Sequence, residues 1–221
     1  MYNVDMETLA LFPLNTVLFP GQLLPLHIFE PRYRQMIGEC IQQGQPFGVV
    51  LIRSGEEVGG APAELHGVGT TAHIVQVERL DDGRMNILCV GAARFRIAHT
   101  YDDRPYPYGH VDLWPWQPFT AGSADLTLIR NRLDRYVQAL AELTESQLEI
   151  ELPADPAALA NTAAAILQID TEEKQELLST RSINDLLLNV SDLLQRELRV
   201  WQIVQGSRQI SRDEATSFSL N

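Results

Sequence analysis

The sequence predicts an α+β fold, in which a region of β-strands is followed by a region of helices. In the first half, short runs of apolar and β-branched residues alternate with glycine and proline turn signals. In the second half, apolar residues recur at the three- and four-residue spacing of helices. A proline- and tryptophan-rich segment, residues 114–118, separates the two patterns. The expected division is a β subdomain over residues 1–118, a helical-bundle subdomain over 119–206 and a frayed polar tail over 207–221.

Prolines punctuate the first predicted strands. Residues 9–14 and 16–19 are short apolar runs, and the Pro20-Gly21 pair after them indicates a turn. Residues 22–29 resume as a strand. Pro25 lies inside this run and has no N–H to donate to a neighbouring strand, so we expect the strand at a sheet edge or a bulge.

One helix interrupts the β region. Glu30-Pro31 indicates its start, because a proline at the first helical position loses no hydrogen bond. Gly44 is expected to end it. The residues that share one buried helical face are Tyr33, Met36, Ile37, Cys40 and Ile41.

A hairpin is expected in the middle of the chain. Residues 70–80 and 84–90 read as strands on either side of the turn sequence Asp81-Asp82-Gly83. Residues 54–62 are rich in glycine and acidic residues and predict a surface loop, and residues 63–66 are a poor strand. The remaining expected strands are residues 47–53, 93–97 and 108–113.

The second half carries signals for four helices. An apolar stripe over residues 126–140 predicts the first. Asp155 followed by Pro156 predicts a capped start for the second. Residues 170–173 resemble a capping box that opens the third. Ser182 opens the longest helix, which we expect to run to about residue 205.

Composition and charge exclude several classes of protein. Hydrophobic residues at 45% and charged residues at 21% are typical of a globular protein, and no apolar run reaches the ~20 residues needed to cross a bilayer. The net charge of −12 would repel DNA and RNA, whose binding depends on lysine and arginine contacts to phosphates. Because the N-terminus has acidic residues where a signal peptide has basic ones, we expect a cytoplasmic protein that binds neither nucleic acid nor membrane.

The cysteines and histidines do not predict a metal site. Cys40 and Cys89 fall in a predicted helix and a predicted strand, and we interpret them as buried reduced thiols. No CxxC or CxxH spacing occurs. The histidines, which show no HxH or HxxxH spacing, are His27, His66, His73, His99 and His110. No metal and no cofactor is predicted.

Several short motifs occur in an order that resembles one known family. The opening ones are Pro13-Leu14, Phe19-Pro-Gly21 and Leu24-Pro-Leu26. The middle ones are Val68-Gly-Thr70, Gln76-Val77, Asp82-Gly83 and Gly91 with Arg94-Phe-Arg-Ile97. The helical ones are Leu159-Ala-Asn161, Lys174-Gln-Glu-Leu-Leu178 and Leu186–Leu188. Together they resemble the N-terminal, substrate-binding domain of the ATP-dependent Lon protease over residues ~9 to ~200. The resemblance implies a partly closed, β-barrel-like sheet with one packed helix, followed by an α-helical bundle.

The sequence lacks the catalytic machinery that accompanies this domain in Lon proteases. An ATPase needs a GxxxxGK[ST] loop, and no Gly-Lys dipeptide occurs. A Lon-type peptidase needs a serine activated by a lysine, and the chain has one lysine, Lys174. We expect Lys174 to be exposed and fully charged, because acidic residues flank it. No residue is therefore predicted to be catalytic.

Six residues are the sequence-based candidates for contacting a bound peptide. Phe19, Leu23 and Leu24 surround a turn next to a proline-broken edge strand, where an apolar patch could accept an unfolded segment. Pro20 lies in the same turn, and a core role for all three apolar residues is the competing interpretation. Trp114 and Trp116 could stack on an extended peptide, or could pack between the two subdomains.

The favoured interpretation is a stand-alone, non-enzymatic module that binds unfolded or apolar protein segments. A separate protease or regulator would then act on what it holds. The alternative is a structural or adaptor scaffold that docks onto a protease or regulator through its helices. A third reading, a small-molecule enzyme, predicts a deep pocket with converging polar groups. The sequence predicts no oligomeric state.

Overall fold

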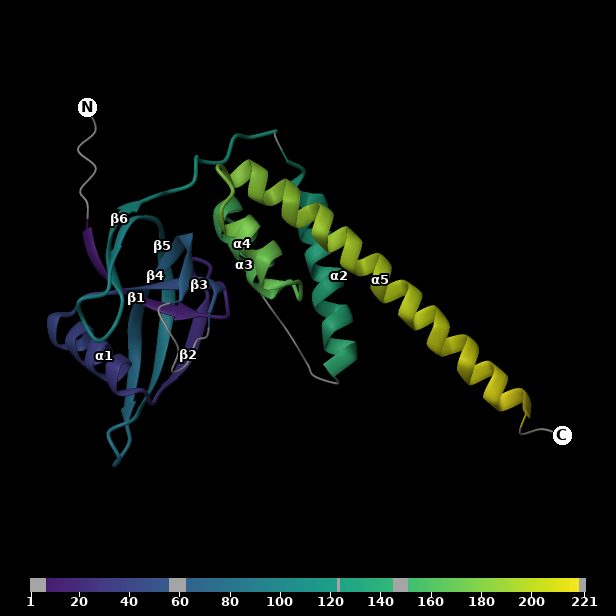
Figure 1. The fold of residues 1–221 in the computed structure, drawn as a ribbon. Helices are drawn as coiled ribbons and strands as arrows, with labels where there is room; N and C mark the ends of the chain where they lie inside the picture. The colour runs from purple at the N-terminus through teal and green to yellow at the C-terminus, as the bar shows by residue number, and fades with distance from the viewer. Residues whose placement is uncertain (1–6, 56–62, 123, 145–150, 219–221) are drawn as a thin grey trace.

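The structure, a computed structural model, describes residues 7–55, 63–122, 124–144 and 151–218, with residues 204–218 as backbone alone. Figure 1 shows a strand-rich part that contains the N-terminal half of the chain and a helical part beside it. Most of the loop expected at residues 54–62 lies outside the described residues. The α+β architecture predicted from the sequence is confirmed.

Six strands form one sheet that partly closes on itself. Their order is β2-β5-β4-β3-β1-β6, and β6 pairs with β5 as well as with β1, which closes a ring of five strands. β1 and β3 are parallel, and the other pairs are antiparallel. The bounds are β1 Glu7–Leu14, β2 Leu23–Ile28, β3 Phe47–Ser54, β4 Glu64–Arg79, β5 Met85–Tyr101 and β6 Tyr108–Leu113. β2 pairs only with β5 and is an edge strand, which agrees with the position of Pro25.

Strand β5 changes its outer neighbour halfway along its length. Its first part pairs with β2 as far as Val90, and its last part pairs with β6 from Phe95 onward. At Gly91, the chain before β2 crosses β5. Gly91 N–H donates to the Gln22 carbonyl at 2.9 Å, and Gly21 N–H donates to the Gly91 carbonyl at 2.8 Å. A segment of β5 is thus left between its two outer partners.

Helix α1, Pro31–Gln43, follows the prediction closely. Its buried residues include Met36 and Ile37, and the Tyr33 ring stacks on Phe12 of β1 with the ring centroids 4.3 Å apart. Gly44 ends the helix in the left-handed conformation, with φ of 65°, and its N–H bonds the last helical carbonyls. The helix therefore completes one apolar core beneath the sheet.

Four helices form the second half of the chain. They are α2 Leu126–Thr144, α3 Pro156–Ile166, α4 Thr171–Leu178 and α5 Ile183–Phe218. The Asp155 side chain caps α3 by accepting from Ala158 N–H at 2.8 Å, as predicted. Asp170 makes no side-chain cap on α4, so the predicted capping box is wrong there. Ser182 and Asp185 bond each other at the start of α5 instead.

The longest helix ends later than the sequence suggested. We expected an end near residue 205, yet α5 continues to Phe218. Gly206 in a helix interior costs only about 1 kcal/mol relative to alanine, and the arginine, glutamine, glutamate and alanine residues after it favour helix. The cost of a single glycine is therefore too small to end the helix by itself.

Three strand predictions also need correction. Residues 16–19 form no strand. Their buried carbonyls are satisfied locally instead, because Leu18 O accepts from Thr70 Oγ1 at 2.6 Å and Phe19 O accepts from Gln22 N–H at 3.1 Å. Residues 64–66, read as a poor strand, open β4, where Leu65 pairs with Ile52. The strands predicted at residues 84–90 and 93–97 are parts of one continuous strand, β5, which begins at Met85.

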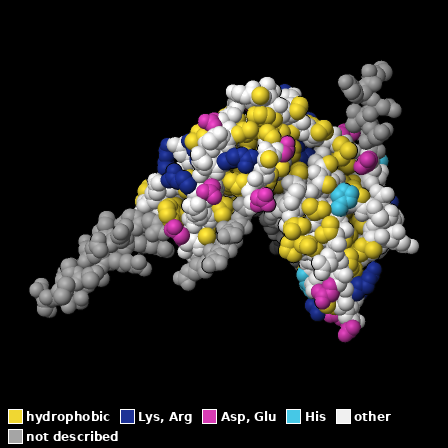
Figure 2. Space-filling view, turned by 180° about the vertical axis from the view of Figure 1, so that it is seen from behind, with side chains coloured by type: hydrophobic (Ala, Val, Ile, Leu, Met, Phe, Trp, Pro, Cys, Tyr) yellow, Lys and Arg dark blue, Asp and Glu magenta, His cyan; other side chains and the backbone are white. Residues whose placement is uncertain are grey.

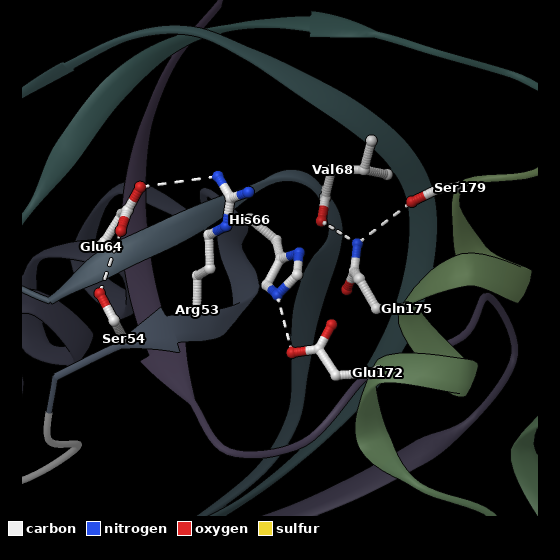
Figure 3. A network of polar contacts seen from close by, with 8 residues as sticks. All are labelled: Arg53, Ser54, Glu64, His66, Val68, Glu172, Gln175 and Ser179. Atoms are coloured by element: carbon white, nitrogen blue, oxygen red, sulfur yellow. Dashed lines mark hydrogen bonds and ion pairs between the residues drawn. The ribbon is translucent and has the colours of Figure 1, made fainter.

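The strand and helix halves share an apolar core and polar contacts. Phe19 and Leu51 lie in the same buried cluster as Leu159 and Leu186 of the helices. Figure 3 shows the polar contacts between β4 and α4. Gln175 Nε2 donates to the Val68 carbonyl at 3.0 Å, and His66 Nε2 lies 3.3 Å from a Glu172 carboxylate oxygen. The helices therefore pack directly on the sheet.

Among the glycines that the structure describes, Gly91 has the closest backbone neighbour to an added methyl group. A Cβ there would lie 2.3 Å from the Phe19 carbonyl oxygen, a backbone atom that cannot step aside. We expect Gly91→Ala to lower the free energy of unfolding by about 2–4 kcal/mol in urea denaturation. Gly38→Ala is the matched control, because Gly38 is inside α1 with no neighbour within 4 Å and should gain about 0.5–1 kcal/mol. Equal stability of Gly91→Ala and wild type would contradict the close crossing.

Both cysteines are buried free thiols, and burial raises their pKa values, to about 11 for Cys40 and about 12 for Cys89. Because the thiolate is the reactive form, alkylation by iodoacetamide at pH 8 should be slow in the native protein. We expect labelling in 6 M guanidinium to be at least ~100-fold faster than in the native protein, with the rate measured by mass spectrometry. Fast native labelling of either thiol would show that its surroundings open readily.

Candidate functional site

A cavity of about 570 Å³ lies where the sheet, the helices and the chain between them meet. We call it the junction pocket. It borders the part of β5 between its two outer partners and the linker, residues 114–125, which connects β6 to α2. Its lining consists of Pro20, Ala92, Ala93, Arg94, Leu113, Pro115, Trp116, Pro118, Phe119, Asp155, Ala157, Asn161 and Ile183.

Most of the lining side chains are apolar. Leu113 at the end of β6 is 46% exposed, although it is a large apolar residue beside the cavity. Trp116 and Phe119 of the linker are half-buried and also contact the helical core. Figure 2 shows broad apolar areas over both the sheet part and the helical part on one face of the molecule. Such a concave, mainly apolar site suits an apolar ligand group.

The linker is held in place from both sides. Trp114 N–H donates to the Arg94 carbonyl on β5 at 2.8 Å. Gln117 exchanges backbone hydrogen bonds with the turn before α5, since its N–H donates to Arg181 O and its carbonyl accepts from Ile183 N–H. The pocket wall formed by the linker is therefore anchored to the sheet and to the helices.

Arg94 lines the pocket and is 2% exposed. Its guanidinium carbon lies 3.5 Å from the ring centroid of Trp116 and 4.3 Å from that of Trp114. Nη1 donates to Leu178 O at 2.5 Å and to Thr180 O at 2.8 Å, at the end of α4. Stacking on two indoles and bonds to helix-terminal carbonyls together offset the cost of burying this charge.

Part of the Arg94 guanidinium has no hydrogen-bond partner among the described residues. Nε and Nη2 are buried and unbonded, and no carboxylate in the described part of the chain forms an ion pair with them. Burial lowers the pKa of Arg94 to about 9, and the positive charge of Arg96 adds to the effect. Arg94 thus remains charged at neutral pH, in a place where its charge is only partly compensated.

Two polar residues of α3 complete the lining. Asn161 is 6% exposed, its Nδ2 donates to the Ala157 carbonyl at 2.8 Å, and its Oδ1 is buried without a partner. Asp155 is exposed and its carboxylate is used to cap α3. A donor group and an acceptor group that lack partners therefore border the same apolar cavity.

The six sequence-based candidates are placed at different depths. Phe19 is fully buried, and Leu24 packs half-buried against the core beneath the sheet. Leu23 is 58% exposed on the edge strand β2. Pro20 and Trp116 both line the junction pocket, and Trp114 stacks on Arg94 and Arg96 beside it. The structure thus places Pro20 and Trp116 in the pocket lining and Trp114 beside it, while Phe19, Leu23 and Leu24 are not among the lining residues.

Sequence reasoning missed Arg94, Asn161 and Phe119 as lining residues. Arg94 was noted only inside a strand motif, because alternation along β5 does not predict which face it takes. The register of β4 against β5 shifts between Thr70 and Ala72, and both Arg94 and Phe95 are buried. The available signal was a pair of arginines, Arg94 and Arg96, in an apolar strand that precedes the tryptophan-containing segment 114–118.

Lys174 is not the exposed side chain that its acidic neighbours suggested. It is half-buried, and its ammonium donates to the Ala165 carbonyl at 3.0 Å. Burial lowers its pKa. Its hydrogen bond ends on a backbone carbonyl and not on a serine hydroxyl, so it is not arranged as the base of a serine-lysine pair.

Within the described part of the chain, no group of three or more histidine, cysteine or acidic residues could hold a metal ion.

A second groove, of about 690 Å³, runs between α2 and α5 and is lined by Arg132, Arg135 and Arg199 with other polar residues. Of the helices that the structure describes, none has the length and apolarity to cross a membrane.

Comparison with known proteins gives one consistent family. The model of the ATP-dependent protease La (LON) substrate-binding domain matches residues 8–196. The chain is 30% identical over 207 residues to a Lon protease of Paraburkholderia phytofirmans, covering 90% of this chain and 25% of that protein. It is 27% identical over 203 residues to Lon protease 2 of Myxococcus xanthus, covering 89% and 24%. The chain thus spans about a quarter of the length of these relatives.

A solved structure has the same fold. The Lon N-terminal domain protein from Xanthomonas campestris superposes with a TM-score of 0.64 at 24% sequence identity. The match covers 83% of this chain and 96% of that one. The partly closed sheet followed by helices is therefore the fold of Lon N-terminal domains.

The stacking of Arg94 makes a specific prediction about stability. Arg94→Lys keeps a positive charge but loses the flat group between the indoles and at least one carbonyl bond. It should lower the free energy of unfolding by about 1–3 kcal/mol in urea denaturation. Arg96→Lys is the matched control, because Arg96 is exposed and stacks on Trp114 alone. This variant should lower the free energy of unfolding by less than about 0.5 kcal/mol. Equal effects of the two variants would refute a structural role for the Arg94 stack.

Proposed function

Because this chain belongs to the family of ATP-dependent protease La (LON) substrate-binding domains, we propose that it binds exposed apolar segments of other proteins. Binding occurs at the junction pocket. The observation that carries this proposal is an apolar cavity of about 570 Å³ whose wall includes exposed Leu113 and the linker aromatics. Burial of an apolar side chain there would remove both its own surface and that of the wall from water.

The bound segment runs from the junction pocket toward the edge strand β2. Pro20 lines the pocket, and Leu23 begins β2 three residues later with 58% of its surface exposed. Trp116 contacts the segment inside the pocket, and Trp114 contacts it beside Arg94. Phe19 and Leu24 act indirectly, since their burial fixes the position of the turn that carries Pro20 and Leu23.

Binding of this kind is weak. An unfolded segment loses conformational entropy when it is held, and the apolar pocket takes only one or two side chains. A dissociation constant on the order of 10 μM to 1 mM follows. The net charge of −12 disfavours strongly acidic segments and nucleic acids.

We also propose a cytoplasmic location, which the free thiols Cys40 and Cys89 support.

We propose that the chain acts by binding and breaks no bond itself. None of its 221 residues forms a Gly-Lys dipeptide, so no phosphate-binding loop of the GxxxxGK[ST] kind is present in them. Polar groups do converge on the junction pocket, as a small-molecule enzyme would require. However, Arg94 stays protonated near neutral pH, Asn161 does not titrate, and the Asp155 carboxylate caps a helix.

The second candidate function is an adaptor that docks through its helices. Helix α5 exposes Leu188, Val200 and Ile203, the last at 69%, and it extends well past α2 in Figure 1. Val200 and Ile203 are three residues apart and therefore lie on one face of the helix. A native partner that stays bound through size exclusion, and is lost in Val200→Ser/Ile203→Ser, would favour the adaptor; many weakly held unfolded clients would favour recognition.

A peptide titration tests the recognition proposal. A peptide rich in leucine and phenylalanine should shift the backbone amide NMR signals of residues 92–94 and 113–119, with a dissociation constant on the order of 10 μM to 1 mM. Ala92→Phe, which fills the mouth of the pocket from an exposed strand position, should weaken binding about tenfold or more.

Ala98→Phe is the matched control for Ala92→Phe. Ala98 is also exposed on β5 but does not line the junction pocket, so this variant should bind like wild type. No amide shift at millimolar peptide would refute the recognition function. If both variants weakened peptide binding equally, the binding site would not be the junction pocket.

A further inference from the structure

The two unbonded nitrogens of Arg94 form one edge of its guanidinium. Nε–H and one N–H of Nη2 point in the same direction, and this pair of donors matches the two oxygens of a carboxylate. The opposite corner, Nη1, is occupied by Leu178 O and Thr180 O. Arg94 thus presents a complete bidentate edge that no described residue uses.

The charge around this edge favours an anion. Arg96 also lies over the Trp114 ring, with its guanidinium carbon 3.6 Å from the ring centroid. No described carboxylate pairs with Arg94 or Arg96 within 4.0 Å. The carboxylate of Asp155 in the pocket lining is engaged at the start of α3. In a protein of net charge −12, this is a local positive site.

Asn161 supplies the complementary group. Its Oδ1 is a buried acceptor without a partner, while its amide nitrogen is fixed on the Ala157 carbonyl. Because Asn161 lines the junction pocket, this acceptor suits an N–H of a ligand bound there. The pocket therefore offers two donors, one acceptor and apolar walls.

We propose that the junction pocket binds the C-terminal residue of a polypeptide, with its free carboxylate on Arg94, its own N–H on Asn161 and its apolar side chain against the linker. This assignment rests on the proposed recognition function and names its preferred ligand. A C-terminal leucine or phenylalanine carries all three groups in one residue. An internal apolar residue offers only neutral carbonyls, which bond a guanidinium more weakly than a carboxylate does.

Access to the Arg94 edge involves one tryptophan. Nε and Nη2 are shielded from solvent, and the indole of Trp116 is fixed by a hydrogen bond from its Nε1 to Thr180 Oγ1 at 3.0 Å. Trp114 is held to the two arginines by stacking. Trp114 is therefore the side chain that moves when the carboxylate binds, and its fluorescence reports the event.

The test compares two versions of one ligand by calorimetry and fluorescence. The probe is an N-acetylated decapeptide of serine and glycine that ends in phenylalanine-leucine, either as the free acid or as the C-terminal amide. The acid should bind at least tenfold more tightly than the amide, because only the acid supplies a charged bidentate partner. N-methylation of the last peptide nitrogen should weaken the binding of the acid peptide about threefold or more.

Variants of Arg94 and Arg96 show which arginine causes the preference for the acid peptide. In Arg94→Gln the acid and the amide should bind within twofold of each other, while Arg96→Gln should keep at least a fivefold preference for the acid. If Arg94→Gln does not fold, the acid, amide and N-methyl peptides on the wild-type chain decide the matter alone. Tryptophan emission should change with the acid and lose this change in Trp114→Phe.

Other outcomes separate this inference from the proposed function. Tight and equal binding of acid and amide would overturn C-terminal recognition but leave recognition of apolar segments standing. No binding of either peptide at millimolar concentration would overturn both. N-acetyl-leucine lacks the preceding phenylalanine and the backbone that would run toward β2, so it should bind at least tenfold more weakly than the acid peptide. Equal affinity would assign the pocket to a small apolar acid and overturn the polypeptide ligand.

Discussion

The guanidinium of Arg94 connects the three parts of the molecule that have to stay in register. It extends from β5 of the sheet, lies between two indoles at the start of the linker, and bonds the carbonyls at the end of α4. A buried arginine without an acidic partner is unfavourable unless aromatic faces and carbonyl dipoles surround it. The packing of helices on sheet and the shape of the junction pocket both depend on this arrangement.

The pocket exists because one long strand pairs with two different outer strands along its length. β5 pairs with β2 up to Val90 and with β6 from Phe95, and the residues between them face the linker and α3. Gly91 allows the chain before β2 to cross at this point, since any side chain would meet the Phe19 carbonyl. A cavity between the ring of strands and the helices follows from the topology, and the sequence supplies its apolar lining.

Features set by neighbouring residues could be predicted from the sequence, and features set by register could not. Gly44 ends α1, Asp155 caps α3 and Pro25 marks an edge strand, each for a local stereochemical reason. The burial of Arg94 depends on the register shift between β4 and β5, and the burial of Phe19 depends on helices more than 100 residues away. Trp116 was found because it lies beside a proline at the boundary of the two subdomains and its ring could stack on a peptide, while Asn161 is one polar residue in an alanine-rich helix.

The central claim is that apolar segments bind at the junction pocket. Photo-crosslinking tests it most directly, with a peptide that carries a diazirine analogue of leucine and with mass-spectrometric mapping of the attached residues. The account predicts crosslinks to residues 20–23, 92–94 and 113–119, with few elsewhere. Crosslinks concentrated in the groove between α2 and α5, or on the exposed face of α5, would contradict it.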